Sequence, residues 1–137
     1  MKIGITGTRD GWTAAQEFIF RSLVDGWDIE EFHHGDCVGV DEQACAVIEQ
    51  LYGSPIHTHP PKSSNHRANV GGRLYAPKEY IERNHNIVDA VDLLVAIPKE
   101  AKEQRRSGMW ATYRYAIKQG KPTILIYPIG TYDRYNM

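Results

Sequence analysis

Apolar residues in this chain fall into two kinds of segment that alternate from one end to the other. Short, nearly continuous apolar runs are typical of strands buried on both faces of a parallel sheet. Strands are predicted at residues 2–6, 28–34, 55–58, 92–97 and 122–127, and the run at 92–97 is the most strongly apolar. Longer segments with apolar residues three or four positions apart predict helices. These segments are residues 13–24, 40–52, 78–90 and 107–119. The alternation predicts an α/β fold, with a mainly parallel sheet of about five strands and helices on both faces.

Three segments fall outside this pattern. Residues 59–77 contain three prolines, a glycine pair and several basic side chains. A loop of this length in a compact domain is usually functional or disordered, and we expect a lid or a ligand-facing loop. Residues 99–106 form a mixed charged loop, which we expect to be a solvated face unless Arg105 or Arg106 reaches a phosphate. Residues 128–137 are expected to form a tail or an edge extension.

The amino-acid composition limits the classes of protein to which this chain can belong. The 137 residues suit one domain with its own core, and 42% hydrophobic and 24% charged residues are ordinary for a globular protein. No linker divides residues 1–137. The formal net charge of −1 is unlike the basic excess of a dedicated nucleic-acid binder. No apolar run approaches the ~20 residues that span a membrane. Cys37 and Cys45 form no CxxC pair, so we expect free thiols and a cytoplasmic location.

The main functional pattern is a set of small residues where predicted strands meet helices. The first strand runs into Gly7, Thr8 and Arg9, whose hydroxyl and guanidinium groups suit phosphate oxygens. An ordinary turn with a surface arginine explains this motif equally well. The helix at 107–119 begins with Ser107 and Gly108, where unpaired amides attract anions. Together the turns predict a crevice for phosphate at the carboxyl ends of the strands.

A third turn carries carboxylates. Gly35 and Gly39 bracket a segment that includes Asp36 and leads to Asp41. Because carboxylates beside a phosphate would repel it, we expect Asp36 to meet ribose or base. Asp41 either caps the following helix or contacts the ligand.

In their order, these motifs resemble the SLOG superfamily, which joins the DNA-processing DprA/Smf proteins to the LOG proteins. The matching stretches are Thr-Gly-Thr-Arg at 6–9, His-Gly-Asp at 34–36, Gly-Val-Asp at 39–41, Arg-Asn at 83–84 and Ser-Gly-Met-Trp at 107–110. The chain is most similar to small stand-alone YspA-like members from bacteria and phages. The resemblance covers residues 1–127 apart from the 59–77 loop. It implies a Rossmann-like sheet, a nucleotide-type ligand and a homo-oligomer.

Carried over residue by residue, the resemblance implies a set of ligand-binding positions. They are Gly7, Thr8, Arg9, Gly35, Asp36, Gly39, Asp41, Arg83, Asn84, Ser107, Gly108 and Thr112. LOG phosphoribohydrolases carry Pro-Gly-Gly-x-Gly-Thr-x-x-Glu, and this glutamate belongs to their catalytic apparatus. The corresponding residues 107–114 have neither the glycine pair nor the glutamate. The departure favours retained phosphate binding over LOG-type hydrolysis.

The sequence leaves three functions open. We expect binding of a nucleotide or nucleotide-derived small molecule, for sensing or sequestration, with no separate cofactor and no membrane partner. The alternative is an N-glycosidase or phosphoribohydrolase acting on nucleoside 5′-monophosphates, with Asp36, Asp41 and Glu42 as candidate catalytic carboxylates. Single-stranded DNA binding is the third, and the lack of a basic stripe argues against DNA as a partner.

Histidine is frequent, but its spacing does not predict a metal centre. His33 and His34 are adjacent, while His57 and His59 share one side of a predicted strand end. A zinc site needs about four ligands, and no local pattern supplies them. We therefore expect no metal, and expect these side chains to be packed unless His34 or His59 reaches the crevice.

Overall fold

The computed structural model describes residues 1–53 and 55–137, which fold around one seven-stranded sheet. The strands lie in the order β4-β3-β2-β1-β5-β6-β7, and β6 and β7 form the one antiparallel pair among the described strands. The strands are β1 (Lys2–Gly7), β2 (Glu31–His34), β3 (Ile56–Thr58), β4 (Arg73–Leu74), β5 (Leu93–Ile97), β6 (Thr123–Ile126) and β7 (Tyr132–Tyr135).

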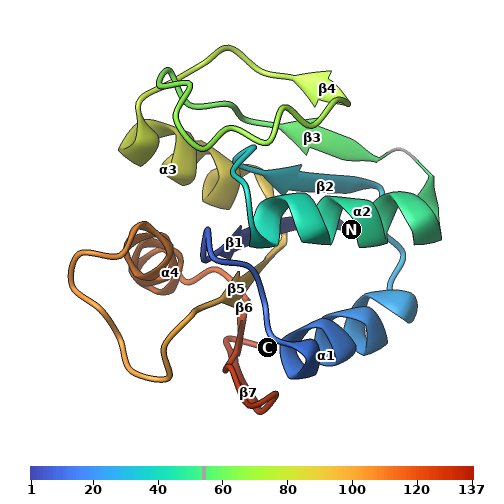
Figure 1. Cartoon of the computed structure of the whole chain (residues 1–137). Helices are drawn as coiled ribbons and strands as arrows, with labels where there is room; N and C mark the ends of the chain where they lie inside the picture. Colours follow the sequence, from blue (N-terminus) through green and yellow to red (C-terminus); the bar gives the residue numbers. More distant parts are fainter. Residues whose placement is uncertain (54) are drawn as a thin grey trace.

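The helices cover both faces of this sheet, with α1 and α2 on one face and α3 and α4 on the other (Figure 1). The helices are α1 (Ala14–Asp25), α2 (Val40–Tyr52), α3 (Tyr80–Ala90) and α4 (Gly108–Lys118). Within the described residues, no helix combines the length and the apolar character needed to cross a membrane. The arrangement confirms the predicted Rossmann-like α/β fold.

Local sequence explains how α1 begins and how it joins the sheet. The Thr13 hydroxyl accepts a hydrogen bond from the Gln16 amide at 3.0 Å, and the Gln16 side chain accepts one from the Thr13 amide at 2.9 Å. This reciprocal pair is a capping box. The buried side-chain NH₂ of Gln16 also donates to the carbonyl oxygens of Pro98 and Ile126. One residue thus caps α1 and ties it to the ends of β5 and β6.

Two short edge strands lie where the sequence predicts a loop and a tail. β4 falls inside the 59–77 segment and pairs with β3, and β7 falls inside residues 128–137 and pairs with β6. Both strands are exposed, so they have no apolar pattern that would predict them. β2 begins at Glu31, later than predicted, because its neighbour β1 begins at Lys2 and pairs with Glu31. Backbone pairing defines these boundaries.

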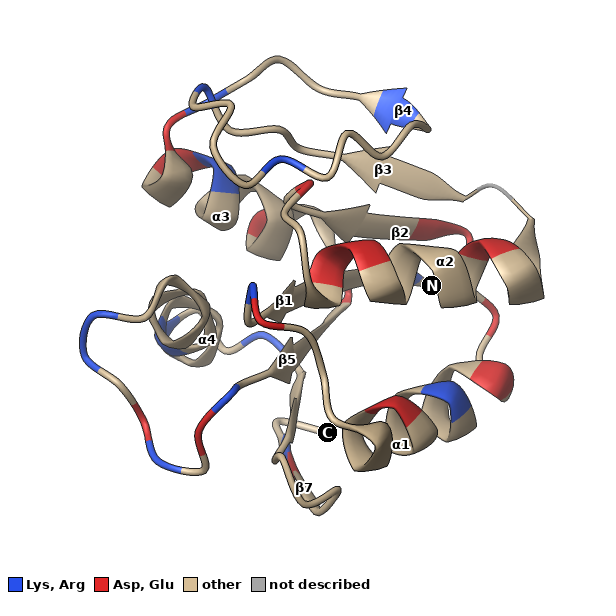
Figure 2. Cartoon of the chain, viewed as in Figure 1, with Lys and Arg blue, Asp and Glu red and all other residues tan. Residues whose placement is uncertain are grey.

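The connections reverse direction across the sheet at β1. The strands β2, β3 and β4 lie on one side of β1, whereas β5, β6 and β7 lie on the other. In open parallel sheets, ligands bind outside the carboxyl ends of the strands at such a switch point. Figure 2 shows basic and acidic residues both at the tip of the turn after β1 and along the segment that leads into α4.

Candidate functional site

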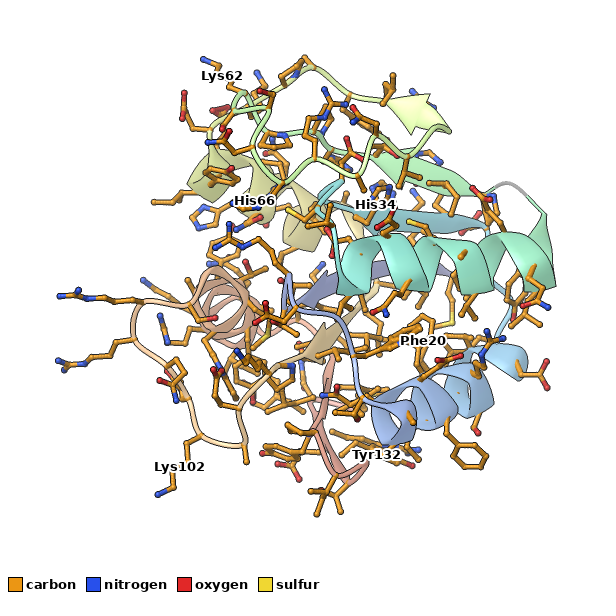
Figure 3. The ribbon with its side chains drawn as sticks, viewed as in Figure 1. Phe20, His34, Lys62, His66, Lys102 and Tyr132 are labelled. Carbon is orange, nitrogen blue, oxygen red and sulfur yellow. The ribbon has the colours of Figure 1, made fainter. Side chains whose placement is uncertain are left out.

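A cavity of about 820 Å³ opens at this switch point. Its walls come from the turns after β1 and β2, from α3, and from the segment between β5 and α4. His66, labelled in Figure 3, lines the cavity from the 59–77 segment. The volume lies within the roughly 300–1,000 Å³ typical of small-molecule sites. Of the expected ligand-binding positions, Asp36 and Gly39 do not line the cavity, and all the others do.

The turn after β1 is held in place by its neighbours. The Thr8 amide donates to the Ile97 carbonyl at 3.1 Å, and the Val40 amide donates to the Thr8 carbonyl at 3.1 Å. Gly39 has a φ of +89°, and a Cβ there would lie 2.4 Å from the Arg9 carbonyl oxygen. Gly39 therefore lets α2 approach the turn, which corrects its expected role as a ligand contact. Because Gly39 has no side chain, the start of α2 can pack against the turn and hold the backbone that presents Thr8 and Arg9.

The start of α4 forms the opposite wall. The Ser107 hydroxyl accepts a hydrogen bond from the Trp110 amide at 3.3 Å and so caps the helix. The amides of Gly108 and Met109 have no acceptor in the described part of the chain. A Cβ on Gly108 would meet nothing within 4 Å, so there is open space beside these amides. The helix N-terminus thus offers both donors and room to an anion.

Arg83 forms the inner wall on the α3 side. It is 5% exposed, and its guanidinium donates to the carbonyl oxygens of Gly35 and His59 and to the Asn84 side chain. A Cβ on Gly35 would lie 2.5 Å from Arg83 Nη1, so this close approach needs glycine. Both Arg83 and Asn84 are held before any ligand arrives. Arg83 contributes positive potential to the cavity, while part of its hydrogen-bonding capacity is already used.

Asp41 is the buried carboxylate of the cavity. Its Oδ2 accepts hydrogen bonds from the amides of Gly35 at 2.9 Å and Cys37 at 3.4 Å. Burial raises the pKa of Asp41 to about 6, although the Arg83 guanidinium and the two amides act to lower it. The side chain does not cap α2, which begins after Gly39 without a side-chain cap. A carboxyl group with this pKa can give or take a proton near neutral pH.

Asp36 has a structural role in place of the expected contact with ribose or base. It is fully buried, and its two carboxylate oxygens accept hydrogen bonds from Arg67 Nε and from the Val70 amide, each at 2.8 Å. Both partners belong to the 59–77 segment, which the carboxylate therefore anchors to the end of β2. Glu42 is exposed on α2 and lies outside the cavity lining, so the geometry gives it no catalytic position either.

The same anchoring limits what the 59–77 segment offers to a ligand. Of its basic residues, His66 alone lines the cavity within the described structure. Arg67 pairs with Asp36, and Lys62 Nζ lies 3.8 Å from Glu79 on the outer surface. Figure 3 shows Lys62 pointing away from the body of the molecule. The segment borders the cavity, but it does not bring a cluster of cations over it.

Several lining residues were not predicted as site residues. Lys99 reaches the cavity from the mixed charged segment before α4, and its Nζ lies 3.0 Å from Asp10 Oδ2 across the opening. Arg106, one of the two arginines of that segment for which the sequence leaves contact with a phosphate open, also lines the cavity. Tyr80 and Ile87 of α3 give the cavity wall an aromatic and an apolar surface. Their helical spacing indicates that one face of α3 packs inward, but it carries no signal for which cavity that face borders.

Comparison with known proteins supports the fold. No family model matches the chain, and no curated protein matches it. Solved structures with a similar fold include the molybdenum cofactor binding protein from the phototrophic bacterium Rippkaea orientalis, with a TM-score of 0.69 and 21% identity over 92% of this chain and 76% of that one. They also include TM1055, a structural-genomics target, with a TM-score of 0.65 and 13% identity over 91% of this chain and 73% of that one. The chain therefore shares its α/β fold with both of these proteins.

Proposed function

We propose that this protein binds a nucleotide or nucleotide-derived small molecule in the switch-point cavity, as a SLOG-like binding domain. The phosphate lies between the Gly7–Arg9 turn and the start of α4. The observation that carries the proposal is the convergence of open helix amides with two arginines, Arg9 and Arg106, on one cavity. Each of these features alone is common on protein surfaces, whereas their convergence is typical of a phosphate site.

The cations around the cavity support the phosphate position. Lys99 is already paired with Asp10. Among the described residues, no carboxylate pairs with Arg9 or Arg106, so both guanidinium groups are free to bind phosphate oxygens. Guanidinium groups bind phosphate through two parallel hydrogen bonds, which fixes the orientation of the ligand as well as its affinity.

The organic part of the ligand is proposed to extend along α3. Tyr80 and Ile87 give this wall an aromatic and apolar character, and the Asn84 side chain and the Asp41 carboxyl add polar groups. This combination suits a heterocyclic base with hydrogen-bonding edges. Since Asp36 is committed to the 59–77 segment, Asp41 and Asn84 take over the role that the sequence suggested for it.

One of the solved structures with a similar fold adds a ligand to those that should be tested. The Rippkaea orientalis protein is described as binding molybdenum cofactor, and it covers most of this chain at low identity. We therefore include molybdenum cofactor beside nucleoside mono-, di- and triphosphates and cyclic nucleotides. Single-stranded oligonucleotides at low salt form a separate arm, because DNA binding would depend strongly on salt.

A thermal-shift screen followed by calorimetry tests the proposal. A ligand of the native state raises the free energy of unfolding by about 2.7 kcal/mol when its concentration is roughly 100 times the Kd. Gly108→Val puts a branched side chain beside the open amides and is expected to abolish the shift. Gly26→Val is the matched control, because a Cβ at Gly26 also meets nothing within 4 Å, at the far end of α1. Equal ligand affinity in the two variants, or no shift with any ligand, contradicts the proposal.

A catalytic function has one specific feature in its favour, which is the buried Asp41 carboxyl in the cavity wall. A buried carboxyl with a pKa of about 6 beside the cavity could activate water in an N-glycosidase. Incubation with nucleoside 5′-monophosphates and chromatography for free base tests this second candidate. Base release that is lost in Asp41→Asn supports hydrolysis, whereas binding without release supports a binding domain.

We also propose that the chain forms a homo-oligomer, as the resemblance implies. Sedimentation with and without ligand tests this proposal.

A further inference from the structure

A second group of polar side chains lies on the sheet, away from the cavity. Glu31 and His33 are two residues apart on β2 and therefore share one face of the sheet. His57 on β3 pairs in register with His33, so its side chain lies on the same face. We call Glu31, His33 and His57 the histidine–glutamate cluster. It lies on the face that α3 and α4 cover, near the start of β2.

The three potential ligand atoms converge on one point. His33 Nε2 lies 2.8 Å from Glu31 Oε1, and His57 Nδ1 lies 4.0 Å from the same oxygen. All three atoms lie within 4.8 Å of one another. Zinc–nitrogen bonds of about 2.0–2.1 Å in a tetrahedral site hold ligand atoms roughly 3.3 Å apart. The separations present in the cluster, from 2.8 Å up to at most 4.8 Å, bracket that spacing.

The surroundings of His33 match those of a metal ligand. Its second ring nitrogen, Nδ1, lies 2.7 Å from His59 Nε2. His59 is held in turn by stacking on Tyr75, with ring centroids 4.1 Å apart and an interplanar angle of 16°. Metal-binding histidines usually have such a partner on the nitrogen that does not bind the metal. In the tautomer whose Nδ1–H donates a hydrogen bond to His59 Nε2, the lone pair of His33 Nε2 points at the cluster.

Exposure leaves one side of the cluster open. The His33 side chain is 1% exposed, while His57 and Glu31 are 13% and 27% exposed. An ion can therefore enter from solvent and keep a water ligand. The Tyr75 hydroxyl is 2.9 Å from His57 Nδ1 and is a further candidate for the fourth position. Lys2 Nζ lies 3.8 Å from the other carboxylate oxygen, Glu31 Oε2, so Oε1 remains directed at the histidines.

We propose that Glu31, His33 and His57 bind a divalent transition metal ion and thereby clamp β2 to β3. Two imidazoles and one carboxylate suit zinc, cobalt or nickel, whereas magnesium and calcium prefer sites made entirely of oxygen. The clamp stabilises the side of the sheet that anchors the 59–77 segment. The sequence does not predict this site, because its third ligand comes from a different strand, 24 positions after His33.

Cobalt and zinc titrations of the chelator-treated full-length protein test the site. One equivalent of Co²⁺ is expected to give visible absorption bands of a low-symmetry site, and Zn²⁺ is expected to displace it. Loss of a direct ligand in His57→Gln is expected to weaken binding by at least about 100-fold, since even outer partners are worth 10–100-fold. Glu31→Gln removes the ligand charge without changing the size of the side chain. His66→Gln is the control, because His66 is exposed and outside the cluster.

The metal affinities of the three variants decide whether the proposed site exists. Tight binding that His57→Gln and Glu31→Gln weaken, but that His66→Gln does not, supports the clamp. Equal affinity in all variants, or no binding of Co²⁺ or Zn²⁺, overturns it. Melting curves of the metal-free variants check that each one folds. Because the cluster and the cavity share no residue, nucleotide binding is expected to be the same with and without chelator, so either proposal can fail alone.

Discussion

Two regions beside the carboxyl end of β2 differ in whether their polar groups already have partners. At the 59–77 segment, buried polar groups satisfy one another: Asp36 binds Arg67, and His34 Nε2 lies 2.7 Å from the Thr58 hydroxyl. At the cavity, the Gly108 amide has no acceptor, and Arg9 has no carboxylate partner, within the described residues.

This difference separates groups that stabilise the fold from groups that are available to a ligand. A buried polar group without a partner costs free energy, so the polar groups of the 59–77 region are paired. The Gly108 amide and the exposed Arg9 guanidinium face the cavity, where solvent can reach them, so they can stay unpaired until a ligand arrives. A motif residue such as Asp36 can therefore belong to either class, and only its contacts decide which.

The largest expected effect comes from breaking the paired region at Asp36. Asp36→Asn keeps the size of the side chain and tolerates the φ of +59°, but it removes the charge that pairs with Arg67. Removal of one partner from a buried ion pair is expected to cost about 3 kcal/mol of unfolding free energy. Urea denaturation measures the loss, and limited proteolysis is expected to begin within residues 59–77.

An exposed ion pair serves as the control for this substitution. Lys78, just before α3, and Glu82, in its first turn, form an exposed pair with Lys78 Nζ 3.8 Å from Glu82 Oε1. Glu82→Gln is expected to change the unfolding free energy by less than about 0.5 kcal/mol. If Asp36→Asn lowers the unfolding free energy as little as Glu82→Gln does, Asp36 does not anchor the 59–77 segment. A contact between Asp36 and the ligand is then the better explanation of the motif.

The second effect is a loss of stability in acid. Burial lowers the pKa of His34 and of His59 to about 3, so both remain neutral in the folded protein while they gain protons in the unfolded chain below pH 6.5. Unfolding then takes up protons, and the unfolding free energy falls by about 1.4 kcal/mol per pH unit for each histidine. Asp41 acts in the opposite direction between its ordinary pKa of 3.8 and about 6. Between pH 6 and 5 these three groups together are expected to lower the unfolding free energy by roughly 1.4 kcal/mol.

Urea denaturation at several pH values checks this dependence. His59→Gln removes one titrating group and is expected to flatten the slope by about one proton between pH 6 and 5. His66→Gln, the same substitution at an exposed histidine, is the control. A slope that does not respond to His59→Gln would assign the acid sensitivity to other groups.

The smallest expected effect concerns the open region. Arg9→Ala and Arg106→Ala each remove a cation that faces the cavity, so each is expected to weaken binding of a phosphorylated ligand roughly 10-fold. Neither substitution is expected to change the unfolding free energy noticeably, because neither side chain is paired within the described structure. Calorimetry measures the affinity. Lys102→Ala is the control, since Figure 3 shows Lys102 pointing outward from the same segment as Arg106.

Much of the fold could be predicted because its signals are local. The strand-like runs predict β1, β2, β3, β5 and β6, with the start of β2 placed too early, and the spacing of apolar residues predicts all four helices that the structure describes. Thr13 and Gly53 mark where α1 begins and where α2 ends, through the cap and through a φ of +82°. The strands β4 and β7 could not be predicted in this way, because both are exposed and their stability comes from pairing with β3 and β6.

The same difference between local and long-range signals applies to the candidate site. By itself, the sequence determined the α/β class and the motifs at the strand ends, because strand, helix and turn preferences depend on residues a few positions apart. Only the tertiary structure decided that Asp36 pairs with Arg67, that Asp41 borders the cavity, and that Glu31 and His33 meet His57. Those contacts depend on the order of the strands in the sheet, which joins segments far apart in the chain and leaves no periodic trace in the sequence.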